Sequence, residues 1–303
     1  MFKHILVPLD GSSLAESVIP VVGALANCLK AKITLIHIIE ANPPETVHGQ
    51  HHISNEMEAC QYLEQIASGL RKDGLLIETH VHTSCVEDLA KSLVDHAKEI
   101  DHDLIVMCTH GESGWKDRFI GSIAQQVIGL GALPVLLLHP IEDKVGINHS
   151  RSFSKFLLAL DGNEDHEAGV KKSLELAREL KAGLHLLTVV ETYSTLSGSE
   201  AATGMLLPTA TSIMLDLEEE DARERLEMMA TDLRTKGFSV SLDVHRGDPV
   251  EWIVKDSYNH ECDLIVLGTH GKSGINAFWA GSSAPRIPGL VKTAILLFPV
   301  HKS

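Results

Sequence analysis

The sequence has few aromatic residues, few cysteines and no long apolar run, and each shortage narrows the kinds of protein it can encode. Aromatic residues make up 4% of the 303 positions, and the five cysteines have no CxxC spacing. An odd number of cysteines without this spacing indicates buried thiols in a reducing compartment. No apolar run approaches the length of a membrane span, and no signal-peptide pattern precedes the first strand. We therefore expect a cytoplasmic protein that does not insert into membranes.

Positive charge is also scarce. The chain has 26 basic and 41 acidic residues, which gives a formal net charge of −15. This balance disfavours general binding to nucleic acid or to anionic membranes. Hydrophobic residues at 44% and charged residues at 22% are typical of a globular protein. A chain of this length can form two domains, each with its own core.

The chain contains an internal repeat of domain length. Residues 5–12 (ILVPLDGS) match residues 156–163 (FLLALDGN), 151 positions later, and residues 103–122 match 263–282, 160 positions later. A period this long indicates duplicated domains and not a solenoid. We expect domains at 1–140 and 153–303, joined by a polar linker over Pro140–Ser152.

Strand and helix patterns alternate in both halves. In the first half, strands are expected at Ile5–Leu9, Lys32–Ile39, Leu75–His82, Leu104–Cys108 and Val135–Leu138; in the second, at Phe156–Leu160, Leu184–Val190, Ser239–His245, Leu264–Leu267 and Ala294–Phe298. Pro20 predicts a kink in the first helix, and Ala41–Asn55 is expected to be a loop. The alternation predicts an α/β fold with two parallel sheets, each covered by helices on both faces.

Small residues follow the fourth strand of the second half. From Gly268 to Ser283 they have the spacing G-x2-G-x9-G-S, which predicts a loop and a helix N-terminus whose amides bind phosphate. Asp10 and Asp161 end the first strand of their halves. If the first and fourth strands are neighbours, each aspartate faces the same crevice as the glycine loop, at the carboxyl edge where such sheets bind ligands. This arrangement suits a nucleotide.

Several catalytic and nucleotide motifs are absent. The GKS at 271–273 is not a Walker A motif, because the required glycine is replaced by Val266 inside a strand. No G-x-G-x-x-G opens a helix after the first strand, and neither a G-x-S-x-G elbow nor an H-E-x-x-H motif occurs. The sequence therefore identifies no catalytic residue.

The strand-1 pattern VPLDGS, the G-x2-G-x9-G-S loop and the final strands PVLLL and AILLF resemble the universal stress protein family, over nearly the whole of both halves. The resemblance implies tandem Rossmann-like (adenine nucleotide alpha hydrolase-like) domains, each with a five-stranded parallel sheet, pairing through the final strands, and a bound ATP, ADP or AMP, with Mg²⁺ as an accompanying ion. The implied nucleotide-site residues in the second half are Asp161, Val189, Gly247, Gly268, His270, Gly271, Lys272, Gly281, Ser282 and Ser283.

The first half departs from the family pattern. Cys108 replaces the leading glycine, and Thr83-Ser84-Cys85 replaces the loop that Arg246-Gly247-Asp248-Pro249 forms in the second half. The corresponding residues are Asp10, Ile38, Gly111, Gly121 and Ser122. We expect nucleotide in the second half and leave the first half open, because a side chain at Cys108 narrows the pocket.

Simpler interpretations stand beside several of these assignments. Asp10 and Asp161 are also suited to be turn or N-cap aspartates, His110 and His270 to packing within their loops, and Lys272 to a solvated loop. The histidines His48, His51, His52, His80 and His82 form a weak candidate metal cluster without a complete zinc signature. The apolar stretch Met205–Pro208 is expected to cover either the nucleotide crevice or a partner surface.

The sequence thus favours an ATP-binding stress-response or regulatory protein whose nucleotide occupancy changes conformation or association. The alternatives are a slow Mg²⁺-dependent ATPase, a dimerisation module with a relic site in the first half, and a zinc-binding variant. No paired acid and base supports more than weak hydrolysis. The apolar final strands also predict pairing of the two domains and, beyond that, a homodimer.

Overall fold

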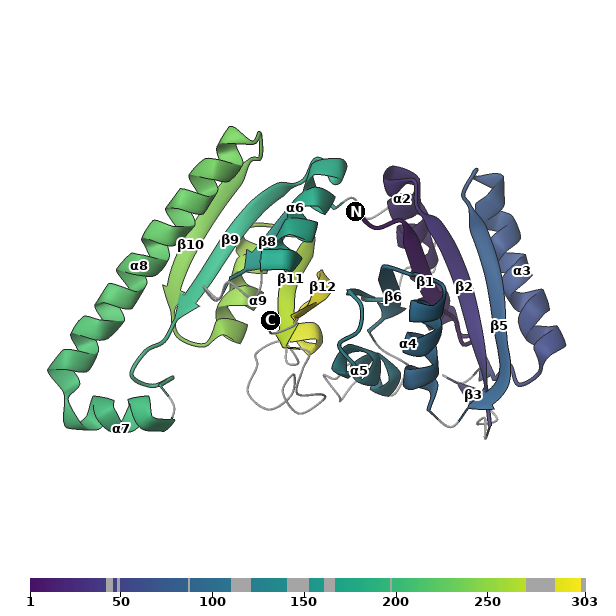
Figure 1. The fold of residues 1–303 in the computed structure, drawn as a ribbon, viewed down its shortest axis with the longest axis horizontal. Helices are drawn as coiled ribbons and strands as arrows, with labels where there is room; N and C mark the ends of the chain where they lie inside the picture. The colour runs from purple at the N-terminus through teal and green to yellow at the C-terminus, as the bar shows by residue number, and fades with distance from the viewer. Residues whose placement is uncertain are drawn as a thin grey trace. The chain divides into compact units, whose positions relative to one another are not determined.

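The computed structural model describes nine stretches of the chain: residues 1–41, 46–47, 50–86, 88–109, 121–140, 153–160, 167–196, 198–270 and 287–300. The chain forms two compact units (Figure 1). Unit 1 comprises Met1–Ser152 together with Gly268–Ser303, and unit 2 comprises Phe153–Leu267. Each unit contains a parallel sheet covered by helices, so the predicted α/β class is confirmed.

Unit 1 has five parallel strands in the order β7-β6-β1-β2-β5. They are β1 (His4–Pro8), β2 (Lys32–Glu40), β5 (Ile77–Val86), β6 (Leu104–Cys108) and β7 (Val135–Leu138). The central strand β1 reads as a continuous apolar run, and its three middle residues are fully buried, as expected for a strand covered on both faces. The first and fourth strands of this unit are neighbours, as a shared crevice requires, since Ile5 pairs with Leu104.

Helices cover both faces of this sheet (Figure 1). α2 (Ile19–Leu29) and α3 (Glu56–Lys72) lie on one face, and α4 (Leu89–Glu99) and α5 (Ser122–Gly129) lie on the other. The expected kink at Pro20 is a complete break. A short helix α1 (Ser13–Glu16) ends before it, and Pro20 lies in the first turn of α2, where its missing N–H costs no helical hydrogen bond.

The last strand of the sequence also belongs to unit 1. β12 (Ala294–Val300) lies antiparallel to β7, with Ile295 opposite Leu137 and Leu297 opposite Val135. The expected pairing of the two final strands is therefore confirmed. It gives β7 a strand neighbour on each side, so that its backbone groups are not left at an open sheet edge.

Unit 2 repeats the same strand order. Its described parallel strands are arranged β10-β9-β8-β11, equivalent to β5-β2-β1-β6 of unit 1. The strands are β8 (Lys155–Ala159), β9 (Gly183–Val190), β10 (Val240–Arg246) and β11 (Leu264–His270), and the helices are α6 (Glu167–Leu180), α7 (Gly198–Leu206), α8 (Pro208–Thr235) and α9 (Pro249–Asn259).

The stretches between β2 and β5 and between β9 and β10 contain more regular structure than the sequence indicated. The stretch Ala41–Asn55 holds a small hairpin of β3 (Thr46–Val47) and β4 (Gln50–His51). Between β9 and β10, helix α8 begins at Pro208, because proline is well suited to the first helical position. After the second glycine loop, a 3₁₀ turn at Ile287–Gly289 contains Pro288.

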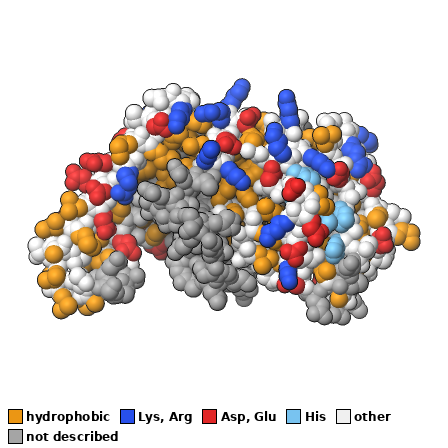
Figure 2. Space-filling view, viewed as in Figure 1, with side chains coloured by type: hydrophobic (Ala, Val, Ile, Leu, Met, Phe, Trp, Pro, Cys, Tyr) orange, Lys and Arg blue, Asp and Glu red, His pale blue; other side chains and the backbone are white. Residues whose placement is uncertain are grey.

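Apolar side chains are exposed along α7 and the start of α8 (Figure 2). They include Met205 at 86% and Leu206 at 79% exposed, followed by Leu207, Ile213 and Leu217. The described cysteines also differ from expectation. Cys262 is buried, but Cys28 and Cys60 are exposed, because each lies on the outer side of an amphipathic helix.

Among the described residues, no helix combines the length and apolar character needed to cross a membrane.

Leu137→Ala tests the importance of the β7–β12 pairing. Leu137 is fully buried and lies opposite Ile295, so we expect the free energy of unfolding of unit 1 to fall by about 2–5 kcal/mol, measured by urea denaturation. Leu130→Ala is the control, because Leu130 is 43% exposed and its removal should cost less than about 0.5 kcal/mol. Equal losses for the two variants would contradict the packing described here.

Candidate functional site

A cavity of about 300 Å³ lies at the carboxyl ends of β1, β2 and β6. Four of the predicted first-half residues line it together: Asp10, Ile38, Gly121 and Ser122. They come from the end of β1, from β2 and from the start of α5. β1 and β6 are the strands between which the chain order reverses, the position where open α/β sheets bind ligands.

Asp10 has a structural role at the rim of this cavity. Its Oδ1 accepts hydrogen bonds from the Ser12 backbone N–H at 2.9 Å and from the Ser12 hydroxyl at 2.6 Å. Ser12 in turn caps helix α1, because its Oγ accepts from the Ala15 N–H at 3.1 Å. The turn-aspartate interpretation therefore describes Asp10 correctly. The same turn places Asp10 in the cavity wall.

The start of helix α5 also lines the cavity. Its N-cap is Gly121, whose backbone N–H donates to the Thr109 carbonyl oxygen at 2.7 Å. No described side chain caps this helix, so its first N–H groups can donate to an anion. A Cβ at Gly121 would lie 3.7 Å from the Thr109 oxygen, an ordinary contact. The glycine is therefore not required for folding.

Sequence reasoning missed the histidine that connects the cavity to the insertion. His37 is buried on β2, with Nδ1 2.8 Å from the Leu9 carbonyl oxygen and Nε2 3.1 Å from the Ile53 carbonyl oxygen. It therefore links the end of β1 to the segment after the β3–β4 hairpin. An apolar strand gives no local signal for such a contact.

His52 lines the cavity beside Glu40. Its side chain is buried, and neither ring nitrogen has a hydrogen-bond partner among the described residues. Nε2 lies 3.8 Å from Glu40 Oε1, longer than a hydrogen bond. Burial lowers the pKa of His52, partly offset by the Glu40 carboxylate. The wall thus presents a neutral imidazole and an acid, both able to bond a polar ligand.

Cys108 lies in the cavity wall at the position that Gly268 occupies in the second repeat. It is half-buried, and Ser17 Oγ approaches its sulfur at 3.8 Å. The predicted narrowing of the first site thus has a physical basis, because the thiol adds atoms where a glycine would leave space.

In the second repeat, the structure describes three of the predicted positions. Val189 lies near the end of β9 opposite His245, and Gly268 lies in β11. Gly247 follows β10 with a φ of +132°, and a Cβ there would lie 3.3 Å from Trp252 Nε1. The loop after β10 therefore requires glycine.

The remaining predicted positions are outside the part of the chain whose side chains are described. They are Asp161, Gly271, Lys272, Gly281, Ser282 and Ser283 in the second half, together with Gly111, His110 and His48. His270 ends β11, and its side chain is likewise not described.

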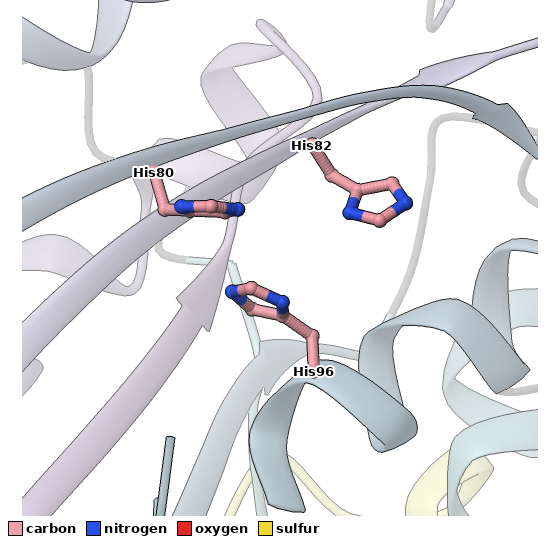
Figure 3. Close-up of side chains that lie close together, drawn as sticks. All are labelled: His80, His82 and His96. Atoms are coloured by element: carbon pink, nitrogen blue, oxygen red, sulfur yellow. The ribbon is translucent and has the colours of Figure 1, made fainter. Parts of the chain in front are cut away.

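The histidines of the candidate metal cluster separate into two groups. His51 lies on the hairpin with Nε2 3.0 Å from Glu58 Oε1, and His52 lies in the cavity. His80 and His82 instead gather with His96 of α4 (Figure 3), and their ligand nitrogens lie within 4.8 Å of one another. The two histidines that share one face of the third strand, His80 and His82, are thus joined by His96, which the sequence analysis did not name.

Comparisons with known proteins agree with this geometry. Residues 1–139 and 152–298 each match the model of the Universal stress protein family. Universal stress protein Rv2623 of Mycobacterium tuberculosis is 25% identical over 308 aligned positions, covering 97% of this chain and 95% of that protein. Universal stress protein Sll1654 of Synechocystis is 30% identical over 139 positions, covering 46% of this chain and 86% of that protein.

Solved structures show the same fold over the full length. A universal stress protein from Archaeoglobus fulgidus has a TM-score of 0.68 at 15% identity, covering 98% of this chain and 96% of that one. The protein PA1789 of Pseudomonas aeruginosa, described as functionally unknown, has a TM-score of 0.66 at 16% identity, with 98% and 92% covered.

Gly247→Ala tests the close approach of the β10–α9 loop to Trp252. The new Cβ adds a contact to a strained backbone, so we expect a loss of about 1–3 kcal/mol in unfolding free energy, measured by urea denaturation. Gly237→Ala is the control. Gly237 also has a positive φ, +90°, but nothing lies within 4 Å of its Cβ position. A loss at Gly237 equal to or greater than that at Gly247 would refute the role of the Trp252 contact.

Proposed function

The chain is a tandem member of the universal stress protein family, and from this premise we propose that it binds an adenine nucleotide, ATP or its products, and acts as a regulatory protein. Nucleotide occupancy then changes its conformation or its association with partners. Such regulation requires that the nucleotide bind one state more tightly than the other. A site that holds ATP, without an efficient means to consume it, serves that purpose.

The observation that carries the proposal is the cavity of unit 1. Asp10, Ile38 and the adjacent pair Gly121 and Ser122 were selected from the sequence and come from three separate places in the chain, yet they line one cavity. Its volume of about 300 Å³ is at the lower end of the range for small-molecule sites. The wall offers a carboxylate for hydroxyl groups, an apolar floor for a base, and helix N–H groups for phosphate.

The second repeat is the stronger candidate for tight binding, because it carries the complete glycine pattern and has Gly268 in place of Cys108. Its Arg246 side chain is held by Glu219 and by Asp216, the latter at 2.7 Å. Arg246 is the last residue of β10, and these two acids are on α8. The ion pairs therefore hold the arginine side chain against α8, next to the loop that contains Gly247.

We expect the purified protein to retain ATP, ADP or AMP. Denaturing it and analysing the supernatant by ion-exchange chromatography against nucleotide standards measures the identity and the number of equivalents per chain. A protein that releases no nucleotide and shows no thermal shift with added ATP would disprove the proposal.

Substitutions then show which of the two repeats binds each equivalent of nucleotide. Gly268→Val with Gly281→Val should remove the nucleotide of the second repeat, because side chains fill the phosphate loop. Adding Gly121→Val to that variant should remove any remaining binding, and the backbone at Gly121 tolerates a side chain. Unchanged affinity and stoichiometry in the triple variant, measured by calorimetry, would place the nucleotide elsewhere.

A slow Mg²⁺-dependent ATPase remains the alternative. A turnover assay with ATP and Mg²⁺ separates the two functions, since a binding protein should release less than one phosphate per site within the lifetime of its complex. Sustained multiple turnovers, abolished in the Gly268→Val, Gly281→Val variant, would favour the enzyme.

We further propose that two chains associate. Light scattering at working concentration should give the mass of a homodimer, that is, about twice the 33.0 kDa of one chain. The mass of a single chain over the whole accessible concentration range would contradict this.

A further inference from the structure

Four side chains of unit 2 converge between the sheet and helix α9. His185 comes from β9, Asp243 from β10, and Asp256 and His260 from α9 and the residue after it. One ligand atom of each lies within 4.8 Å of the others. We call these four residues the His/Asp cluster. Two imidazoles and two carboxylates are a donor set that Zn²⁺ accepts in a tetrahedral site.

His185 is the central residue of this cluster. Its side chain is fully buried, and Nδ1 lies 3.0 Å from Ser241 Oγ. Nε2 has no hydrogen-bond partner among the described residues. Asp256 Oδ2 at 3.6 Å and Asp243 Oδ2 at 3.7 Å are the carboxylate oxygens it faces. A buried imidazole nitrogen without a bond is costly.

These separations match two ligands of one metal ion better than a hydrogen bond. Ligands at about 2.0–2.2 Å from a tetrahedral Zn²⁺ lie about 3.4 Å from each other, whereas a hydrogen bond requires about 2.7–3.2 Å. The imidazole of His260 stacks on that of His185, with 3.7 Å between the ring centroids. An imidazole nitrogen without a hydrogen-bond partner can offer its lone pair to a metal.

The buried carboxylate of Asp256 requires a compensating partner. Asp256 is 2% exposed, and its Oδ2 accepts from His245 Nε2 at 3.0 Å; Asp243 Oδ2 accepts from His260 Nε2 at 2.9 Å. In the described part of the chain, the ion pairs of these two acids involve histidines and no lysine or arginine. A divalent cation would balance two carboxylates without protonating a buried imidazole.

The first repeat has ligand-type residues at the same position. In the strand pairing, His80 lies opposite Ile36, and Asp243 lies opposite Leu187. Ile36 and Leu187 are 151 positions apart, which is the spacing of the repeat, so His80 and Asp243 occupy equivalent positions. The 160-position offset of the DLIV strands likewise aligns His96 with Asp256. Two copies that have diverged elsewhere thus both place potential ligands between the third strand and the following helix.

We propose that the His/Asp cluster, formed by His185, Asp243, Asp256 and His260, binds a divalent transition metal, with Zn²⁺ as the preferred ion. The bound metal joins β9, β10 and α9. Ser241 is a positioning residue that orients His185 through Nδ1, as the outer partners of metal-bound histidines do. The site lies between the sheet and helix α9, and its metal binding does not depend on nucleotide binding.

The test uses the full-length protein, stripped of metal with a chelator and titrated with Zn²⁺ by calorimetry. Co²⁺ then serves as a spectroscopic probe, because tetrahedral Co²⁺ absorbs strongly in the visible range. We expect tight Zn²⁺ uptake, a higher melting temperature with the metal, and a tetrahedral Co²⁺ spectrum. A stripped, folded protein that takes up no Zn²⁺ would overturn the proposal.

Asp243→Asn with His260→Gln removes two ligands without touching the buried pair, since the side chains of Asp243 and His260 are 40% and 29% exposed. We expect this variant to fold and to lose one Zn²⁺ equivalent, while Ser241→Ala weakens Zn²⁺ binding about 10- to 100-fold. His51→Gln is the matched control, because His51 is an exposed histidine outside the cluster. A double variant that binds Zn²⁺ with unchanged stoichiometry and affinity would refute the assignment.

His80, His82 and His96 form a second group of side chains that could hold a metal ion, separate from the His/Asp cluster (Figure 3). His96 is buried, and its Nε2 has no hydrogen-bond partner among the described residues. We infer that these three histidines bind Zn²⁺ and leave the fourth coordination position to water.

His82→Gln tests this second site separately. It should remove one Zn²⁺ equivalent from the wild-type protein, and it should remove the last equivalent when combined with Asp243→Asn and His260→Gln. If His82→Gln leaves the number of bound Zn²⁺ ions unchanged, the three-histidine site is refuted and the His/Asp cluster is unaffected.

Discussion

The pairing of β1 with both β2 and β6 is the interaction on which the rest of unit 1 depends. It places the strand with the most deeply buried residues in the centre of the sheet and makes β1 and β6 the point where the chain order reverses. The loops after these strands must then meet at one edge. Asp10 and the start of α5 reach the same cavity for this reason, although they are more than a hundred residues apart.

Duplication of this unit solves a problem that one copy alone would have. Each repeat ends in an apolar strand, and an exposed strand of this kind invites aggregation. The antiparallel pairing of β7 with β12 satisfies the backbone of β7 within the same chain. Duplication also allows the two copies to diverge. Cys108 stands in the cavity wall of the first copy where the second has Gly268, and His96 stands where the second has Asp256.

The two proposed kinds of site use different parts of the sheet. The cavity lies at the carboxyl ends of the strands, where loops and a helix N-terminus provide N–H groups for an anion. The metal clusters lie under α4 and α9, where side chains from strands and a helix converge. The pairs His245–Asp256 and His245–Trp252 extend from the His/Asp cluster to the loop at Gly247. Metal binding would therefore stabilise the same helix that follows this loop.

The sequence by itself determined the α/β class, the duplication and most strand positions, because apolar runs and repeated motifs are local signals. It also selected Asp10, Ile38, Gly121 and Ser122, through the resemblance of its motifs to those of the universal stress protein family. It did not locate the start of α8 at Pro208, the contacts of His37, or His96 beside His80 and His82. Only the tertiary structure decided these. The proposed ligands His185 and His260 are 75 positions apart on different elements, and no local spacing records which side chains a folded sheet and its helices bring together.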